Sequence, residues 1–193
     1  MQQQVSQYVD ENVTRQKFQQ ELDGFKKQKA HYRSIGVFLL DEEYPNAYFG
    51  FAALKLRPVP IVFAVKINFT NYDVEPLSVK FINPITFQEI KITETNTLLY
   101  RKIENSRPQE LLQAQTDQIP FFCIPGVREY HEHTAHTGDA WFLHRKRAGE
   151  GSLCFILDNL QLYGTNPITS FNLQINLNGQ FVNVPPNEML IAK

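Results

Sequence analysis

The sequence predicts an α+β fold in which an N-terminal helix packs on an antiparallel meander sheet. Three observations lead to this prediction: a helical apolar pattern after Thr14, consecutive strand-like runs between residues 35 and 84, and a second helical pattern followed by a hairpin. Strands that follow one another directly, with helices before and after them, are typical of antiparallel α+β domains. A long irregular segment is expected between the meander and the later helix.

The first helix is predicted from apolar residues at steps of four, three and seven, which place one face of a helix against a sheet. These residues are Phe18, Leu22, Phe25 and Tyr32. Residues 1–12 are polar and rich in glutamine, so we expect a flexible leader there and a single domain over residues 13–193.

The meander is predicted from four runs, residues 35–40, 47–56, 59–69 and 77–84. The third run has the strongest strand signal, because its apolar residues alternate strictly. They are Ile61, Phe63, Val65, Ile67 and Phe69. Residues 85–120 are harder to interpret: "TFQEIKITET" fits a strand, and "RPQELLQAQTDQ" fits a short helix or a mobile insertion.

The later helix begins after Ser152, a residue type suited to the N-cap, and Gly164 suits its C-terminal stop. Its apolar face is made of Leu153, Ile156, Leu157 and Leu160. A hairpin closes the chain, because apolar residues alternate from Phe171 to Leu177 and Asn178-Gly179 is a strong hairpin turn.

The composition limits the functional classes. The 193 residues are 42% hydrophobic, as in a folded domain, and the formal net charge is −1 without a basic stripe, which argues against a nucleic-acid binder. No apolar run approaches the length of a membrane span, and the polar N-terminus has no signal core. We therefore expect a cytoplasmic protein with reduced cysteines.

Four of the five histidines lie in one stretch, "CIPGVREYHEHTAHTGDAWFLHR", residues 123–145. Along an extended chain Glu129, His131 and His133 would point to one side, because side chains alternate. The turn at Pro125-Gly126 would bring in the sulfur of Cys123, with His136 as a competing ligand. Mixed sulfur, nitrogen and oxygen donors suit zinc or another divalent transition metal.

An alternative interpretation of this stretch is a hydrogen-bonded loop or polar network without metal. In that case Asp139 and His144 would be solvated, whereas beside a metal Asp139 is expected to orient a liganding imidazole. Glu132 is expected to face solvent. Trp141 is expected to anchor the loop by packing, and His144 and Arg128 to be solvated.

The stretch C-x-P-G-x-x-E-Y-H-x-H resembles a family of predicted metal-binding proteins named for a Cys, Glu, His, His signature. Its ligand positions match Cys123, Glu129, His131 and His133. That family is encoded beside bacterial ubiquitin-like modifiers and their activating enzymes, conjugating enzymes and JAB-type proteases. The resemblance implies a role in such a pathway, with antiphage defence as a candidate context.

Residues 14–84 resemble the first helix and meander of ubiquitin-conjugating enzymes, which implies a UBC-like fold. Tyr72, Pro76, Phe81 and Pro84 occupy the places of a tyrosine, a turn proline, a strand residue and a loop proline in that family. The chain departs from the family further on, because the His-Pro-Asn tripeptide is absent and the spacing to Cys154 is long. Cys154 also lies in an apolar helical run, where a buried structural cysteine is commoner than a nucleophile.

Three functions remain open from the sequence. The first is a metal-binding accessory or conjugating-enzyme-like component that binds a ubiquitin-like modifier or its activating or conjugating enzymes, with no nucleic acid or membrane partner. The second is an active conjugating enzyme that carries the modifier as a thioester on Cys154 or Cys123. The third is a zinc-dependent hydrolase, in which three protein ligands hold zinc and a water takes the fourth position.

Overall fold

The computed structural model describes residues 6–95, 99–101, 107–114, 118–145 and 149–170, together with the backbone of residues 173–177 and 180–184. The helices are α1 (Glu11–Lys27), α2 (Lys29–Ser34), α3 (Arg128–Glu132), α4 (Trp141–His144) and α5 (Leu153–Leu160). Short 3₁₀ turns lie at Ile92–Glu94 and Thr134–His136, and a π-helical turn at Gln161–Thr165 follows α5.

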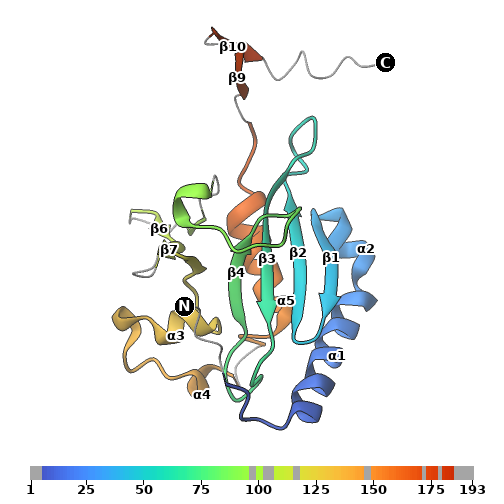
Figure 1. The fold of residues 1–193 in the computed structure, drawn as a ribbon, viewed down its shortest axis with the longest axis vertical. Coiled ribbons are helices and arrows are strands. Elements are labelled where there is room, and N and C mark those ends of the chain that lie inside the picture. Colours follow the sequence, from blue (N-terminus) through green and yellow to red (C-terminus); the bar gives the residue numbers. More distant parts are fainter. Residues whose placement is uncertain are drawn as a thin grey trace.

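The central sheet is an antiparallel meander of four strands in the order β1-β2-β3-β4, as the sequence predicts (Figure 1). The strands are β1 (Val37–Glu43), β2 (Asn46–Ala52), β3 (Ile61–Asn68) and β4 (Ser78–Ile82). Phe49 lies opposite Val65, and Val65 lies opposite Phe81, so one row of apolar side chains crosses three strands. This row faces the core, and all three residues are fully buried.

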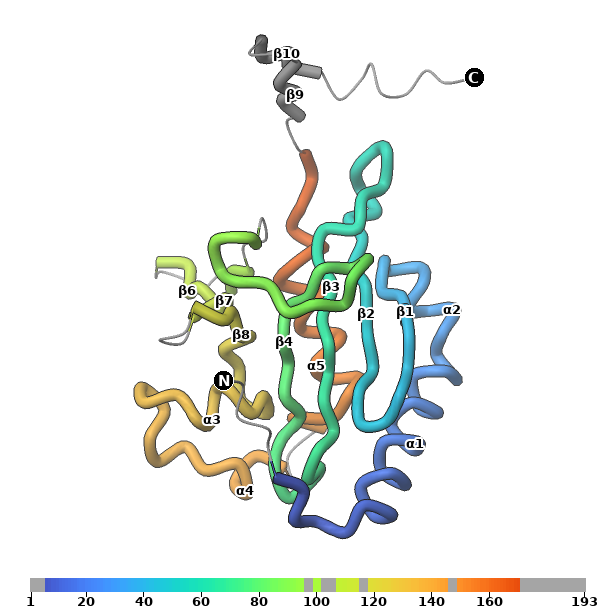
Figure 2. The backbone as a smooth tube through the Cα atoms, viewed as in Figure 1, coloured from blue at the N-terminus to red at the C-terminus, as the bar shows by residue number. Residues whose placement is uncertain are grey.

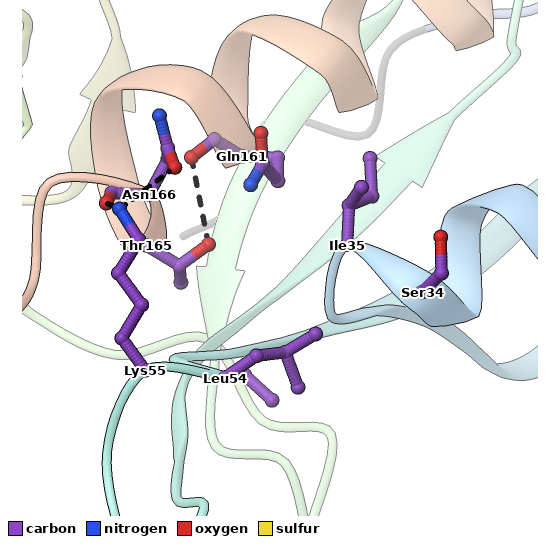
Figure 3. A pocket seen from close by; sticks show the side chains of 8 residues that line it. Ser34, Ile35, Leu54, Lys55, Gln161, Thr165 and Asn166 are labelled. Carbon is purple, nitrogen blue, oxygen red and sulfur yellow. Dashed lines mark hydrogen bonds between the residues drawn. The ribbon is translucent and has the colours of Figure 1, made fainter.

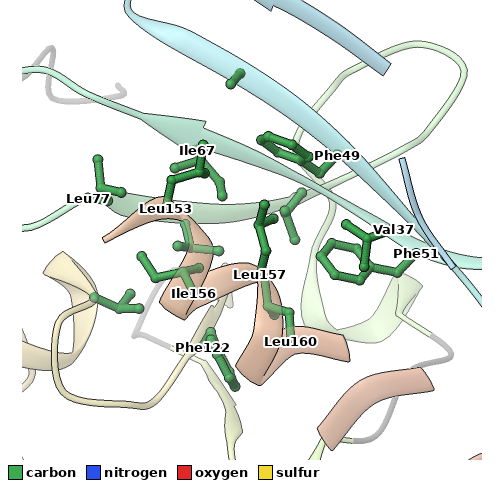
Figure 4. Packing of buried hydrophobic residues seen from close by; sticks show 14 of the residues in the cluster. Val37, Phe49, Phe51, Ile67, Leu77, Phe122, Leu153, Ile156, Leu157 and Leu160 are labelled. Carbon is green, nitrogen blue, oxygen red and sulfur yellow. The ribbon is translucent and has the colours of Figure 1, made fainter. Parts of the chain in front are cut away.

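Helices α1 and α5 pack on the apolar face of this sheet and enclose the core. Figure 4 shows this packing for α5, whose side chains, Leu157 among them, face Phe49 and Ile67 of the sheet. The predicted face of α1 is buried, and so are the four predicted apolar residues of α5. The helix face predicted from Phe18, Leu22, Phe25 and Tyr32 is therefore confirmed, although Tyr32 lies on α2 because the helix is interrupted at Gln28.

The opposite face of the sheet is crossed by residues 83–95 (Figure 2). Phe87 packs on Tyr48 with ring centroids 4.9 Å apart, and Lys66 forms an ion pair with Glu89. The expected strand over residues 86–95 is wrong, since the described chain has only one isolated bridge and a 3₁₀ turn there. The side chain of Asn83 accepts hydrogen bonds from two following amides and turns the chain instead.

Four very short strands follow, β5 (Tyr100–Arg101) paired with β6 (Gln109–Glu110), and β7 (Leu112–Ala114) paired with β8 (Pro120–Phe122). The short helix considered for residues 107–118 is wrong in its described part. Leu111 donates its amide to the carbonyl of Leu99 and accepts from the amide of Cys123, so the backbone is extended between two neighbours.

The start of α5 is capped from two directions. Ser152 Oγ accepts from the amide of Phe155 at 3.2 Å, which confirms the predicted N-cap. Glu21 of α1 accepts from the amide of Leu153 and is itself held by the hydroxyl of Tyr72. Gly164 does not stop the helix; a Cβ there would lie 2.7 Å from the Phe63 ring, so the glycine is required by packing.

The N-terminal end of the described chain is held by side-chain hydrogen bonds, and the C-terminal end forms a hairpin. Residues 6–9 are held by Asn71, whose side chain accepts from the amide of Tyr8 at 2.9 Å and donates to the carbonyl of Ser6. The hairpin β9 (Leu173–Leu177) and β10 (Gln180–Val184) forms as predicted, while Asn178, Gly179 and Phe171 lie outside the described residues. None of the helices in the described ranges is long and apolar enough to cross a membrane.

We predict that Leu157→Ala lowers the free energy of unfolding by about 3 kcal/mol, because it leaves a cavity between α5 and the sheet. Leu157 has no exposed surface, whereas Leu162 in the next turn is 46% exposed. Denaturant titration of Leu157→Ala beside Leu162→Ala measures the difference. Equal losses in the two variants would contradict the placement of α5 over the core.

Candidate functional site

The histidine-rich segment lies beyond the β4 edge of the sheet, where β8 leads into α3 and α4 (Figure 1). It starts at a close crossing of two glycines: a Cβ on Gly126 would lie 2.6 Å from the amide nitrogen of Gly151. Both glycines have positive φ, 91° and 77°, which other residues rarely adopt. Trp141 packs against Gly151 and donates its indole N–H to the carbonyl of Asp73 at 3.0 Å, which anchors the loop as expected.

The backbone from Arg128 to Glu132 is helical, so the extended chain on which the ligand geometry was predicted is wrong. In a helix side chains repeat every 3.6 residues rather than every two, and Glu129, His131 and His133 therefore do not share one side. The helix forms because its first residues are fixed by contacts with the sheet edge. The amide of Arg128 donates to the carbonyl of Leu77 at 2.9 Å, and Arg128 and Glu129 are both buried.

Glu129 binds the edge of β4. One carboxylate oxygen accepts from the hydroxyl of Ser78 and lies 3.1 Å from the ammonium of Lys80. The other accepts from the amide of Val79 at 3.0 Å. Because the carboxylate is only 2% exposed, these three groups take the place of its hydration.

Arg128 is also buried, at 4% exposure, and the expectation of a solvated side chain is wrong. Its guanidinium donates to the carbonyls of Pro76 and Thr70 and pairs with Glu75 at 3.4 Å. The arginine thus ties α3 to the loop that precedes β4. Glu132 is exposed, as expected.

His131 has both ring nitrogens engaged by the backbone. Nε2 accepts from the amide of Gly126 at 3.0 Å, so Nδ1 carries the proton and donates to the carbonyl of Asp139 at 2.7 Å. Burial lowers the pKa of His131, and the hydrogen bond to the Asp139 carbonyl opposes this only in part. The neutral ring therefore bridges the start and the end of the segment.

Cys123 and His136 are in direct contact, with Sγ 3.3 Å from Nε2. The imidazole stacks on the ring of Tyr130 at a centroid distance of 3.8 Å. Burial raises the pKa of the Cys123 thiol, opposed by the guanidinium of Arg101. Burial, and then the neighbouring His133, lowers the pKa of His136. A neutral thiol and a neutral imidazole thus face each other.

His133 lies beside this pair. Its ring centroid is 5.7 Å from that of His136 and 5.4 Å from that of Phe121. Nδ1 accepts from the amide of Ala135 at 3.3 Å, which leaves Nε2 without a hydrogen-bond partner among the described residues. The ring is half-buried.

A second cluster is built around Asp139 and His144. The hydroxyl of Tyr130 donates to one oxygen of Asp139 at 2.6 Å, and His144 binds the other. The second ring nitrogen of His144 lies 3.0 Å from Glu150. Hydrogen bonding to Asp139 raises the pKa of His144, burial opposes this, and Glu150 raises it further. His144 is therefore the charged partner of both Asp139 and Glu150, and its side chain is only 13% exposed.

Within the described residues, no three His, Cys, Asp or Glu side chains converge on one point as a metal site would require. The segment brings Cys123, His136 and His133 near one another, but it turns Glu129 toward β4 and His131 toward the backbone. Asp139 does orient imidazoles, His131 through its carbonyl and His144 through its carboxylate. The partners on β4 carry no sequence signal, because they lie about fifty residues away in the chain.

Cys154 belongs to a different part of the molecule. It lies on α5, half-buried, with Sγ 4.0 Å from the side-chain nitrogen of Gln28. Burial raises the pKa of this thiol, and a hydrogen bond with Tyr32 opposes it. The carboxylates of Glu21 and Asp158 raise the pKa of the thiol further, so these surroundings do not favour the thiolate that a nucleophile needs.

A cavity of about 170 Å³ lies between the end of α2, the end of β2 and the π-helical turn (Figure 3). Lys55 extends along it and donates to the carbonyl and side-chain oxygens of Asn166, so its ammonium is already paired. The histidine-rich segment contributes no residue to its lining.

The comparisons with known proteins cover most of this structure. The model of the Y4jH-like family (the Y4jH family) matches residues 9–119 and 104–168, which include the whole histidine-rich segment. The chain is also similar to the uncharacterized protein y4jH of Sinorhizobium fredii, with 41% identity over 199 residues. That alignment spans 93% of this chain and 96% of the relative.

We predict that His144→Gln destabilises the protein most at mildly acidic pH. A raised pKa in the folded state means that the contribution of His144 is complete below its ordinary pKa of about 6.5 and is lost as pH rises through the folded value. Unfolding free energies of the wild type and the variant over a pH series measure this. Their difference should shrink with rising pH. A difference that grows with pH would contradict a charged His144 paired with Asp139 and Glu150.

Proposed function

The chain belongs to the Y4jH-like family, and we propose that it is a metal-binding, conjugating-enzyme-like component of a bacterial ubiquitin-like conjugation pathway. Its place would be in the cytoplasm, beside the modifier and its activating or conjugating enzymes. The proposal combines the two resemblances of the sequence with the α+β layout of a helix on a four-stranded meander.

The contact between Cys123 and His136 carries the metal part of the proposal. A thiolate and an imidazole bound to one tetrahedral zinc ion place sulfur and nitrogen about 3.5 Å apart. The distance between Sγ and Nε2 is 3.3 Å. His136 is already in the neutral form that binds metal, and the buried thiol would release its proton when the ion binds.

A metal at this position would have a structural role and would stabilise the folded segment. Cys123 follows β8 and His136 ends the 3₁₀ turn, thirteen residues later in the chain. A shared ligand would join the two ends of a segment that has little regular secondary structure of its own. Metal binding then adds its free energy to the folding of this segment.

The state of the thiols favours an accessory role over catalysis. A thioester-forming cysteine needs an accessible thiolate with a lowered pKa. Burial instead raises the pKa of both Cys123 and Cys154, and Cys123 is only 3% exposed. One observation favours the second candidate, an active conjugating enzyme: His136 is a base in contact with Cys123.

We predict that protein purified without an affinity tag contains about one zinc or related ion per chain. Cys123→Ser should lower this content, and acidification through the imidazole range should release the ion, because protons compete for the ligands. Elemental analysis gives the stoichiometry, with Cys154→Ser as the matched control that keeps the metal. Stoichiometry near zero, even with zinc supplied during growth, would reject the metal proposal.

We predict that incubation with the cognate activating enzyme, ATP and modifier gives no reductant-sensitive adduct on this chain, because both thiols are protonated and at least partly buried. A non-reducing gel measures the outcome. An adduct that is lost in Cys123→Ser and kept in Cys154→Ser would replace the accessory role with the conjugating enzyme.

A further inference from the structure

The cavity between the end of α2, the end of β2 and the π-helical turn has the size of one small molecular fragment (Figure 3). Its volume of about 170 Å³ is close to that of a cavity of roughly 150 Å³ that holds one benzene ring. It is below the roughly 300 Å³ at which pockets for drug-sized ligands begin. The cavity therefore has room for one ring or a short branched chain with a small polar head, and it is too small for a nucleotide.

One side of the cavity is apolar. It is formed by Ile35, Ala52 and Leu54, of which Ala52 is buried and the other two are half-buried. Apolar surface that a ligand removes from water contributes to binding in proportion to its area. This side of the cavity therefore suits a hydrocarbon group.

The other side of the cavity offers hydrogen-bond donors that the protein does not use. The ammonium of Lys55 donates to the carbonyl and side-chain oxygens of Asn166, at 2.6 and 3.1 Å, which leaves its third N–H for a ligand. The carbonyl of Gln161 accepts from Thr165 and Asn166, but its side-chain amide has no partner among the described residues. Figure 3 shows the side chain of Gln161 between those of Lys55 and Ile35, so both donors belong to one cavity.

The walls of the cavity come from three stretches of the chain that contain no Asp or Glu, residues 24–40, 44–72 and 159–170. The acid closest in sequence to a lining residue is Asp158, which interacts with Tyr32 and does not line the cavity. An anion in the cavity would therefore meet no carboxylate on its walls.

The cations beside the cavity are not neutralised by the protein. Lys55 and Arg57 lie on the same loop, and the guanidinium of Arg57 donates to the carbonyls of Leu54 and Leu56. The oxygens that accept from these two cations are uncharged, and neither cation forms an ion pair within the described ranges. A concave site bordered by charges of one sign raises the local concentration of counter-ions. The loop therefore favours an anion.

The helix end beside the cavity does not cancel this preference. Carbonyls at the end of a helix carry a partial negative charge, which would oppose an anion. Here the carbonyls of Gln161 and Thr165 accept from following amides, and that of Asn166 accepts from Lys55. The partial charges are thus satisfied, and the ammonium is fixed at the cavity wall.

We propose that this cavity binds a small organic anion. A carboxylate or phosphate head would bind the ammonium of Lys55 and the amide of Gln161, and an apolar body would pack on Ile35, Ala52 and Leu54. The histidine-rich segment contributes no residue to the lining, so this site goes beyond the proposed function and does not depend on metal binding.

The test uses the full chain, labelled for amide NMR and titrated with benzoate, whose ring and carboxylate match the two sides of the cavity. Benzamide has the same shape without the charge. It should bind about tenfold more weakly, because a hydrogen bond to a charged group is stronger than one to a neutral group. The amides around Leu54 and Gln161 should shift, and added salt should weaken the binding of benzoate more than that of benzamide.

Two phosphates distinguish the possible head groups. Phenyl phosphate carries the same ring as benzoate, and inorganic phosphate lacks the apolar body. Phenyl phosphate should therefore bind more tightly than inorganic phosphate if the apolar side contributes. The tighter of benzoate and phenyl phosphate identifies the head group that fits the cavity.

The variants test the groups that would bind the head. Lys55→Met keeps the apolar stem and removes the charge, so it should lower the affinity for benzoate about tenfold and bring it close to that for benzamide. Gln161→Leu keeps the size of the side chain and should also weaken benzoate. Lys26→Met is the matched control, because Lys26 lies on α1 and is paired with Glu42, and it should change neither affinity.

The wild type alone can overturn the proposal. Millimolar benzoate that shifts no amide around the cavity would reject the site, and equal affinities for benzoate and benzamide would reject its preference for an anion. These comparisons need no substitution, so they hold even where a variant alters the cavity. Lys55→Met protein that binds benzoate as tightly as the wild type would reject the role of the lysine.

Discussion

The carboxylate of Glu129 at the edge of β4 is the interaction on which the histidine-rich segment depends. It accepts hydrogen bonds from a hydroxyl and an amide and forms an ion pair with an ammonium. Arg128 beside it donates hydrogen bonds to two carbonyls of the loop that precedes β4. Two adjacent buried charges of opposite sign thus fasten α3 to the sheet. The direction of α3 then decides where His131, His133 and His136 can lie, because each follows α3 closely in the chain.

The fold was predictable where apolar residues repeat with a regular period. Alternation in β3 and the spacing of α1 and α5 identify the core directly, because burial on one face is what the pattern encodes. Between residues 85 and 120 the chain is held by single contacts such as Phe87 on Tyr48 and Leu111 between Leu99 and Cys123. Contacts between distant residues leave no period, and the strand expected over residues 86–95 and the short helix considered for residues 107–118 were therefore wrong in their described parts.

The candidate site was predictable in composition and not in geometry. The density of histidines marked residues 123–145 as unusual, and Cys123 does meet an imidazole, that of His136. The period of two that grouped Glu129 with His131 and His133 assumed an extended chain, whereas tertiary contacts with β4 impose a helix. The sequence does not distinguish a glutamate that binds a sheet edge from a glutamate that binds a metal. The two roles differ only in the residues that surround the carboxylate in space.

The crossing of Gly126 and Gly151 closes residues 127–150 into a loop whose two ends touch. Arg128 and Glu129, at the start of this loop, bind β4 and the segment before it, so changes at these two residues would disturb the sheet. Beyond α3 the two ends of the remaining loop are already fixed, and lengthening it costs little entropy. The part of the loop after α3 can therefore differ in length between related chains while the sheet and α5 keep their arrangement, and the glycine crossing is the boundary of that variation.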